Sequence, residues 1–102
     1  MALAITTTPC PSSSATLANV ASSATTVTVL AANAKRKSVI IMNDSTQILY
    51  LKFGATASTS SFTYKLAGGE TLEIPGAGVI YTGIIDGIWA SANGNARVTE
   101  LI

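Results

Sequence analysis

Two short apolar runs on either side of a polar segment constrain the fold of this chain more than any other feature. Residues 39–42 (VIIM) and 48–51 (ILYL) are rich in β-branched and aromatic side chains, which favour strands. Residues 43–47 (NDSTQ) lie between them and have short polar side chains that bond nearby backbone groups and favour a turn. The pattern predicts a β-hairpin within residues 37–54.

Side-chain alternation indicates which faces of these two strands are buried. In the second strand Leu49, Leu51 and Phe53 share one face, which is the better candidate for a core. The first run is apolar on both faces. A strand of that kind lies in the middle of a sheet, or is covered on its second side by another layer or another subunit.

The composition leaves few charged side chains to cover a surface. Of 102 residues, 48% are hydrophobic and 11% are charged, against roughly 25% charged in an ordinary soluble domain. We therefore expect one domain that buries part of its surface against partners. The net charge of +1 argues against a protein that coats DNA, so no specific nucleic acid is expected as a partner.

The same totals argue against a membrane protein and a disulfide scaffold. The apolar runs are far shorter than the ~20 residues of a transmembrane helix, so no membrane partner is expected. No basic residue precedes the apolar patch at the N-terminus, so a secretory signal is not expected either. The single Cys10 cannot form an intrachain disulfide.

Residues 1–23 are dominated by Ala, Ser and Thr and offer little large apolar surface to offset the entropy of ordering. We expect a flexible or extended N-terminal arm here, followed by a β-sandwich domain over residues 24–102. The arm is either a disordered lead-in or a segment that becomes ordered along a neighbouring subunit. Its anchors in the second case would be Leu3, Ile5, Leu17 and Val20.

Period-two alternation and turn residues predict the remaining strands. They lie at residues 25–30, 62–66, 71–74, 84–91 and 97–102, with a short edge strand at 79–81. Phe62, Tyr64 and Leu66 are expected to face inward. Gly87 interrupts its strand, which indicates a bulge or a close backbone approach.

Two glycine-containing turns predict two further hairpins. Residues 67–70 (AGGE) would join the strands at 62–66 and 71–74, and Asn93-Gly94 would join the last two strands. Short strands at this spacing with no helices between them predict an all-β fold. The expected class is an antiparallel β-sandwich, or a Greek-key or jelly-roll-like barrel.

The side chains that most enzymes need are missing from the sequence. There is no histidine, which excludes Ser-His-Asp and Cys-His arrangements and removes the commonest metal ligand. One cysteine and no histidine also exclude a structural zinc site within one chain. The five acidic residues lie mostly in or beside predicted turns, where a carboxylate is ordinarily solvated. We therefore expect no enzyme, no metal and no cofactor.

Two features could still bind a partner. Lys35-Arg36-Lys37 is the one cluster of charge, and it is either a solvated strand entry, a contact for an acidic protein surface, or a weak nucleic-acid contact. Trp89 is the lone tryptophan, and it belongs either to the core or subunit contact or, together with Tyr81, to a platform on which sugars stack.

A series of short motifs in the last two thirds of the chain resembles small β-sandwich proteins encoded among the virion structural genes of tailed bacteriophages. Each motif is a turn or strand signature, and the similarity lies in their order. The matching residues are Asn33-Ala34, Arg36-Lys37, Ile41, Asn43, Ser45, Leu49-Tyr50, Lys52, Gly54-Ala55, Lys65-Leu66, Gly69, Pro75, Tyr81-Thr82-Gly83, Gly87-Ile88-Trp89 and Ala96 to Glu100.

The resemblance implies a non-enzymatic virion component, displayed on the head or attached to a fibre. The leading hypothesis is a capsid decoration (cement) protein that self-associates, most simply as a homotrimer. It would be assembled in the host cytoplasm onto the major capsid protein or another virion protein. The expected contacts are the N-terminal arm and Lys35, Arg36 and Lys37.

Two other functions remain open on the sequence alone. The first is a glycan-binding or fibre-base module that uses Tyr81 and Trp89. The second is a single-strand nucleic-acid-binding barrel, for which only the neighbouring aromatic and cationic residues Tyr50, Lys52, Tyr64 and Lys65 provide a hint.

Overall fold

The computed structural model describes residues 11–74 and 79–102, which form two antiparallel sheets of four strands each. The expected all-β class is confirmed, and no described residue is helical. The strands are β1 (Ala15–Ala21), β2 (Val27–Leu30), β3 (Ser38–Asp44), β4 (Leu49–Phe53), β5 (Tyr64–Leu66), β6 (Thr71–Ile74), β7 (Ile85–Trp89) and β8 (Asn95–Leu101).

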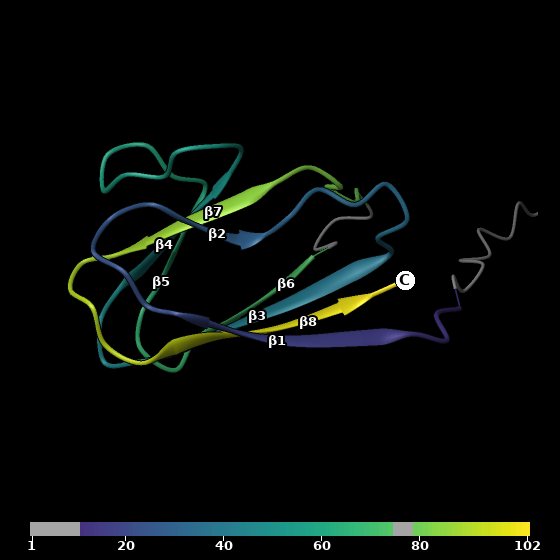
Figure 1. Ribbon diagram of the computed structural model, residues 1–102, viewed down its shortest axis with the longest axis horizontal. Coiled ribbons are helices and arrows are strands. Elements are labelled where there is room, and N and C mark those ends of the chain that lie inside the picture. The colour runs from purple at the N-terminus through teal and green to yellow at the C-terminus, as the bar shows by residue number, and fades with distance from the viewer. Residues whose placement is uncertain (1–10, 75–78) are drawn as a thin grey trace, which may run out of the picture.

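The strand order is that of an eight-stranded jelly roll. One sheet, called sheet A here, has the order β1-β8-β3-β6, and the other, sheet B, has the order β2-β7-β4-β5. Figure 1 shows β2 and β7 of sheet B lying above β1, β8 and β3 of sheet A. The sheets pack face to face as a sandwich.

Three predicted hairpins are wrong in the same way. The runs at 39–42 and 48–51 form β3 and β4, but β3 pairs with β6 and β8, and β4 pairs with β5 and β7. The turns at 67–70 and at Asn93-Gly94 likewise connect strands of opposite sheets. A turn between sheets lets both apolar strand faces meet across the core, which a hairpin within one sheet would not allow.

The core lies between the two sheets and consists of alternate residues of almost every strand. Leu49 and Leu51 are fully buried as expected, and β3 lies inside sheet A with Val39 and Ile41 facing inward. The core residues are Val29, Val39, Ile41, Leu49, Leu51, Leu66, Ile74, Ile85, Trp89, Ala96 and Val98.

Gly87 marks a close approach between strands, as its place in the sequence indicated. A Cβ atom added to it would lie 2.6 Å from Cγ2 of Val29 and 3.2 Å from Cδ1 of Leu49. The register of β2 against β7 also shifts between Thr28 and Leu30. Only a residue without a side chain lets β2 and β7 pack over the core at this point.

Part of the expected N-terminal arm is a strand of the sandwich. β1 pairs along its length with β8, from Ala15 opposite Leu101 to Ala21 opposite Asn95. Every side chain of β1 is exposed except that of Val20, which is partly buried against the core. Backbone hydrogen bonds rather than apolar burial therefore hold this strand.

Two smaller expectations also differ from the structure. Residues 79–81 lie in an irregular segment and form no strand. Phe62 and Tyr64 are 39% and 41% exposed, whereas Leu66 is buried as expected. β5 has only three residues and lies at the edge of sheet B, so the end of this segment extends past the cover that sheet A provides.

Candidate functional site

Arg36 is buried and holds one end of the sandwich together. Its Nε donates a hydrogen bond to Oε2 of Glu100 at 2.8 Å, and 2% of the residue is exposed. The other guanidinium nitrogens donate to the backbone carbonyls of Ala31 (2.6 Å), Tyr81 (2.8 Å) and Gly83 (3.1 Å). A guanidinium has a planar fork of donors, so this one side chain ties the start of β3 to β8 and to two loops.

The expected cationic cluster is therefore split. Lys35 is exposed, and Lys37 is partly exposed and donates from Nζ to the carbonyl of Pro11. Asn33 completes the buried network at Arg36, because its Nδ2 donates to Oε1 of Glu100 at 3.2 Å. Of the three cations only Lys35 and Lys37 can reach an outside partner while the fold is intact.

Trp89 is in the core, and its indole nitrogen has a partner there. The residue is 1% exposed, and Nε1 donates to Oδ1 of Asn43 at 3.3 Å. Nδ2 of the buried Asn43 donates to the carbonyls of Gln47 (2.7 Å) and Leu66 (2.9 Å). Asn43 thus links the two ends of the turn between β3 and β4, and it joins this turn to β5 and to Trp89. Trp89 presents no ring face to a sugar.

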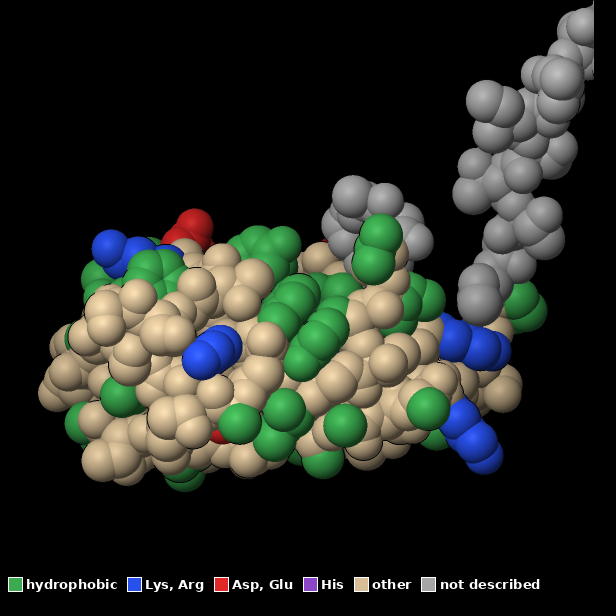
Figure 2. Space-filling view, turned by 90° about the horizontal axis from the view of Figure 1, so that it is seen from above, with side chains coloured by type: hydrophobic (Ala, Val, Ile, Leu, Met, Phe, Trp, Pro, Cys, Tyr) green, Lys and Arg blue, Asp and Glu red, His purple; other side chains and the backbone are tan. Residues whose placement is uncertain are grey.

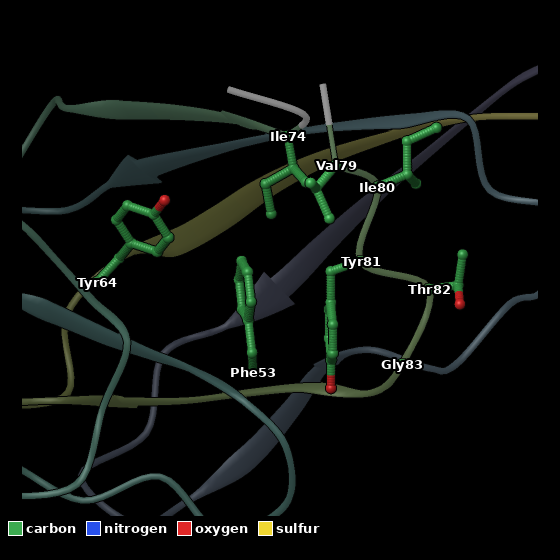
Figure 3. Close-up of a pocket in the computed structure, with 8 residues that line it drawn as sticks. All are labelled: Phe53, Tyr64, Ile74, Val79, Ile80, Tyr81, Thr82 and Gly83. Atoms are coloured by element: carbon green, nitrogen blue, oxygen red, sulfur yellow. The ribbon is translucent and has the colours of Figure 1, made fainter. Parts of the chain in front are cut away.

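Tyr81 lies in an aromatic groove, shown in Figure 3. Its ring stacks on that of Phe53 with centroids 4.5 Å apart and 7° between the planes, and its hydroxyl donates to the Ile84 carbonyl at 2.8 Å. Tyr64 lies on the other side of Phe53, with ring centroids 5.6 Å apart. The cavity has a volume of about 510 Å³ and is lined by Phe53, Tyr64, Ile74, Val79, Ile80, Tyr81, Thr82 and Gly83.

The groove residues come from three strands and a loop, which explains why the sequence pointed to Tyr64 and Tyr81 only separately, for nucleic acid and for sugars, and not to one shared site. Phe53 ends β4, Tyr64 begins β5 and Ile74 ends β6. Figure 2, which looks onto the face over β2 and β7 of Figure 1, shows hydrophobic side chains gathered in its middle and few charged side chains. The surface is apolar enough for contact, and the described residues aim no set of polar groups into the groove.

The outer face of sheet A carries a second apolar surface, called the sheet A face below. Ala96 and Val98 of β8 are buried, so their neighbours in the strand, Arg97, Thr99 and Leu101, point outward. The ladder continues these rows across the sheet: Leu17 and Ile40 flank Thr99, and Met42 flanks Arg97. The apolar members of the sheet A face are Leu17, Ile40, Met42 and Leu101.

Four residues expected to bind a partner belong to the N-terminal segment, and two of them can be placed. Leu17 is 75% exposed on the sheet A face, and Val20 is turned toward the core. Leu3 and Ile5 lie outside the described residues. The structure thus places the two side chains on opposite faces of β1. Successive residues of a strand point to opposite faces, and positions 17 and 20 are an odd number of residues apart.

Within residues 11–74 and 79–102 there is no group of three His, Cys, Asp or Glu side chains that could hold a metal ion. One buried carboxylate oxygen, Oδ1 of Asp86, has no hydrogen-bond donor among the described residues, while Oδ2 accepts a bond from the Thr56 N–H at 2.7 Å. A single carboxylate does not make a cation site. No described helix is long and apolar enough to cross a membrane.

Comparison of the chain with models of protein families, with curated proteins and with solved structures finds no match.

Proposed function

We propose that this chain is a non-enzymatic structural protein of a bacteriophage virion. Its role would be that of a capsid decoration (cement) protein that self-associates and binds the outer surface of the assembled head. The sheet A face is the observation that carries the proposal. It presents Leu17, Ile40, Met42 and Leu101 on four-stranded, rigid backbone, and no described element packs over it.

The charge pattern of that face suits an interface. Among the described residues, one ion pair lies on it and joins Nε of Arg97 to Oδ2 of Asp44 at 2.8 Å, and the two side chains are 48% and 45% exposed. Because these charges neutralise each other, Glu73 at the rim is the remaining ionised group in the rows across β3 and β8. An apolar centre with a sparse polar rim is the usual layout of a protein–protein interface.

The fold supports the same role by analogy. Jelly rolls form many viral capsid and lectin domains, and they also host unrelated functions, so the fold narrows the choice without deciding it. The residues that carry the resemblance to phage virion proteins include Arg36, Asn43, Trp89 and Glu100, which lie in the two buried networks. That resemblance therefore bears on how the chain folds, and the contact surfaces bear on what it does.

A cement protein works by linkage. It binds only the assembled shell, so its binding free energy stabilises that state, by about 2.7 kcal/mol per site when its free concentration is 100 times Kd. Clustering of several copies raises the apparent affinity, because the second contact becomes intramolecular. We propose that the sheet A face makes the contact between copies, and that the arm with Leu3 and Ile5, together with Lys35 and Lys37, reaches the major capsid protein.

Self-association and shell binding are measured in one pair of experiments. Light scattering after size exclusion should give a mass above 10.4 kDa, and the protein should co-sediment with empty shells assembled from the capsid protein of the same genome. Ile40→Glu places a charge at the centre of the sheet A face and should lower the mass, because copies can no longer associate through that face. Thr59→Glu, at an exposed position in the loop between β4 and β5 of sheet B, is the matched control and should leave the mass unchanged. A wild-type protein that has the mass of one chain and does not co-sediment with shells would contradict the proposal.

For the rival function, a glycan-binding or fibre-base module, Tyr81 remains a candidate contact for a sugar, whereas Trp89 does not. One face of the Tyr81 ring is covered by Phe53, and Trp89 is inside the core. The aromatic groove is the observation that favours this rival. We expect a panel of soluble sugars to leave the NMR resonances of the Tyr64 and Tyr81 rings, which line the groove, unchanged. A saturable shift of these resonances would favour the glycan-binding function.

A further inference from the structure

β1 is bonded to the rest of sheet A along one of its two edges. It is the end strand of the sheet, and Figure 1 shows it beside β8 at the lower margin of the molecule. The Ile102 N–H donates to the Ser14 carbonyl at 3.0 Å just before the strand, and the Ser22 N–H donates to the Gly94 carbonyl at 3.1 Å just after it. These bonds establish which residues form the hydrogen-bonded pairs of the ladder.

Hydrogen-bonded and non-hydrogen-bonded pairs alternate along an antiparallel ladder. Because residues 14 and 22 bond toward β8, the even-numbered residues between them do so too. The odd-numbered residues direct their N–H and C=O groups to the open edge, where no described residue bonds to them. These residues are Ala15, Leu17, Asn19 and Ala21.

This open edge lacks the features with which proteins usually prevent strands from pairing. Those features are charged side chains, proline, bulges and a covering loop. β1 has the sequence ATLANVA, and its pairing with β8 is regular. The two charged residues opposite it in the ladder, Arg97 and Glu100, are paired with Asp44 and Arg36. Two copies of the edge can therefore approach without repulsion between like charges.

We propose that the open edge of β1 pairs antiparallel with β1 of a second copy, about a two-fold axis at Ala18. This inference rests on the proposed self-association and adds to the sheet A face a second contact between copies, at the edge of the same sheet. With Ala18 opposite itself, Ala15 faces Ala21 of the partner subunit and Leu17 faces the partner's Asn19. Every one of the four outward residues is then in a hydrogen-bonded pair, so no backbone group of the edge is left without a partner.

A shift of the register would lose part of this match. Sliding one strand by a single residue against the other, which moves the axis by half a residue, pairs outward backbone groups with inward ones, so no hydrogen-bonded pair forms. Moving the axis by one whole residue or more restores outward-to-outward pairs but leaves outward groups at the strand ends without partners. The match is therefore best with the axis at Ala18, where small side chains meet and allow the backbones to come close.

The pairing makes one sheet of the two A sheets and places their outer faces side by side. In this register the two Leu17 side chains become diagonal neighbours on the outer face, about 7–8 Å apart. The apolar surface formed by Leu17, Ile40 and Leu101 is then doubled. A two-fold contact closes after two copies, so it predicts a dimer, or an even number of copies, in place of the trimer expected from the resemblance.

Disulfide trapping tests the register. The native Cys10 is first replaced by serine, and Ala18→Cys and Thr16→Cys are made in that background. Across the axis the Cα atoms of two residues at position 18 lie about 4.5 Å apart in a non-hydrogen-bonded pair, within the range of a disulfide. Two residues at position 16 would be offset by four residues, about 13 Å along the strands, which is too far.

We expect mild oxidation to convert most of the Ala18→Cys protein to a disulfide-linked dimer and to leave the Thr16→Cys protein monomeric on a non-reducing gel. Both positions are exposed and on the same face of β1, so random collision would link them equally. Equal yields from the two variants, or no dimer from Ala18→Cys, would overturn the inference.

A backbone substitution gives a second, independent test. Asn19→Pro removes an N–H that points to the open edge and leaves the bonds to β8 intact, since proline is accepted on that side of an edge strand. Each dimer loses two hydrogen bonds, which should raise Kd about 30-fold. Asn19→Ala keeps the N–H and should not change Kd by more than a few fold. Equal affinities for the two variants would contradict edge pairing.

The outcomes separate this inference from the proposed function. Failure of both tests in a protein that still self-associates and binds shells would reject the β1 contact alone. A wild-type protein that neither self-associates nor binds shells would reject the proposed function itself.

Discussion

The two regions that differ most in how their hydrogen-bonding groups are used are the network at Arg36 and the open edge of β1. At Arg36 a charged side chain is inside the protein, and a carboxylate and three backbone carbonyls accept its hydrogen bonds. At β1 uncharged residues lie outside, and the backbone groups of every second residue have no partner among the described residues.

The comparison teaches that a buried charged residue such as Arg36 stabilises the fold, whereas the uncharged strand β1 leaves backbone groups available for contact with another molecule. A buried charge must be paired, because leaving it unpaired costs several kcal/mol. An exposed backbone edge is satisfied by water until another strand replaces that water. Substitutions at Arg36 should therefore change the free energy of unfolding, and substitutions at the open edge should change association.

The largest effect is expected for Arg36→Met. The substitution leaves the Glu100 carboxylate, whose side chain is 12% exposed, without its cation, and it leaves three carbonyls with fewer donors. We expect the free energy of unfolding in urea to fall by about 3–5 kcal/mol. The double variant Arg36→Met with Glu100→Gln should recover part of this loss, because no unpaired charge remains. Equal stability of the single variant and the wild type would show that Arg36 does not hold the fold.

Gly87→Ala should have an intermediate effect, again on stability alone. The new methyl group would lie 2.6 Å from Cγ2 of Val29, so the strands must move apart or a side chain must leave its rotamer. Overpacking of this kind costs about 1–3 kcal/mol. Val29→Ala removes the clashing methyl groups, and in the Gly87→Ala background it should cost less than it does alone. Additive losses in the four proteins, measured by thermal unfolding, would mean that the two residues do not meet.

The smallest effect is expected for the surface ion pair of the sheet A face. Arg97→Ala breaks a contact between two half-exposed side chains, and such pairs are worth about 0.2–1 kcal/mol. We expect a loss of stability within that range. Its effect on association should be larger, because Asp44 would then add an unneutralised carboxylate beside the interface. Weaker self-association at low salt, with recovery as salt screens the charge, is the expected result in sedimentation experiments.

The strands of this fold could be predicted from the sequence, whereas their pairing could not. β-branched and aromatic runs located β3, β4 and β7, and Gly69 and Gly94 marked turns at which both have positive φ, 85° and 69°. A turn signal describes a few residues of backbone and does not say which sheet the next strand joins. In a jelly roll nearly every connection crosses between the sheets, so reading the turns as hairpins was wrong at each of them.

β1 was missed as a strand for a related reason. Its side chains are small and almost all exposed, so the segment has no pattern of apolar and polar residues. What holds it is the ladder with β8, a long-range contact that leaves no trace in the local sequence. The absence of charge and proline over residues 15–21 was the available signal, and it indicates an edge open to pairing.

The candidate binding residues could be predicted only where local sequence determines exposure. Lys35 is exposed in a turn, as a charged turn residue commonly is. Arg36, beside it, is buried because Glu100 and the loop at 81–83 converge on it from distant parts of the chain. The sequence did not decide whether Trp89 lies in the core or in a platform on which sugars stack. The residue can be buried because the side-chain amide oxygen of Asn43, inside the sandwich, accepts a hydrogen bond from its indole nitrogen.

Residue-resolved amide hydrogen exchange along β1 tests the proposed self-association through its open edge most directly. It is measured at concentrations well above and well below the Kd for self-association. We expect the amides of Ala18 and Val20, bonded to β8, to be protected at both concentrations, and those of Leu17 and Asn19 to become protected only at the higher one. Exchange at Leu17 and Asn19 that stays fast in a concentrated, self-associated sample would contradict the account.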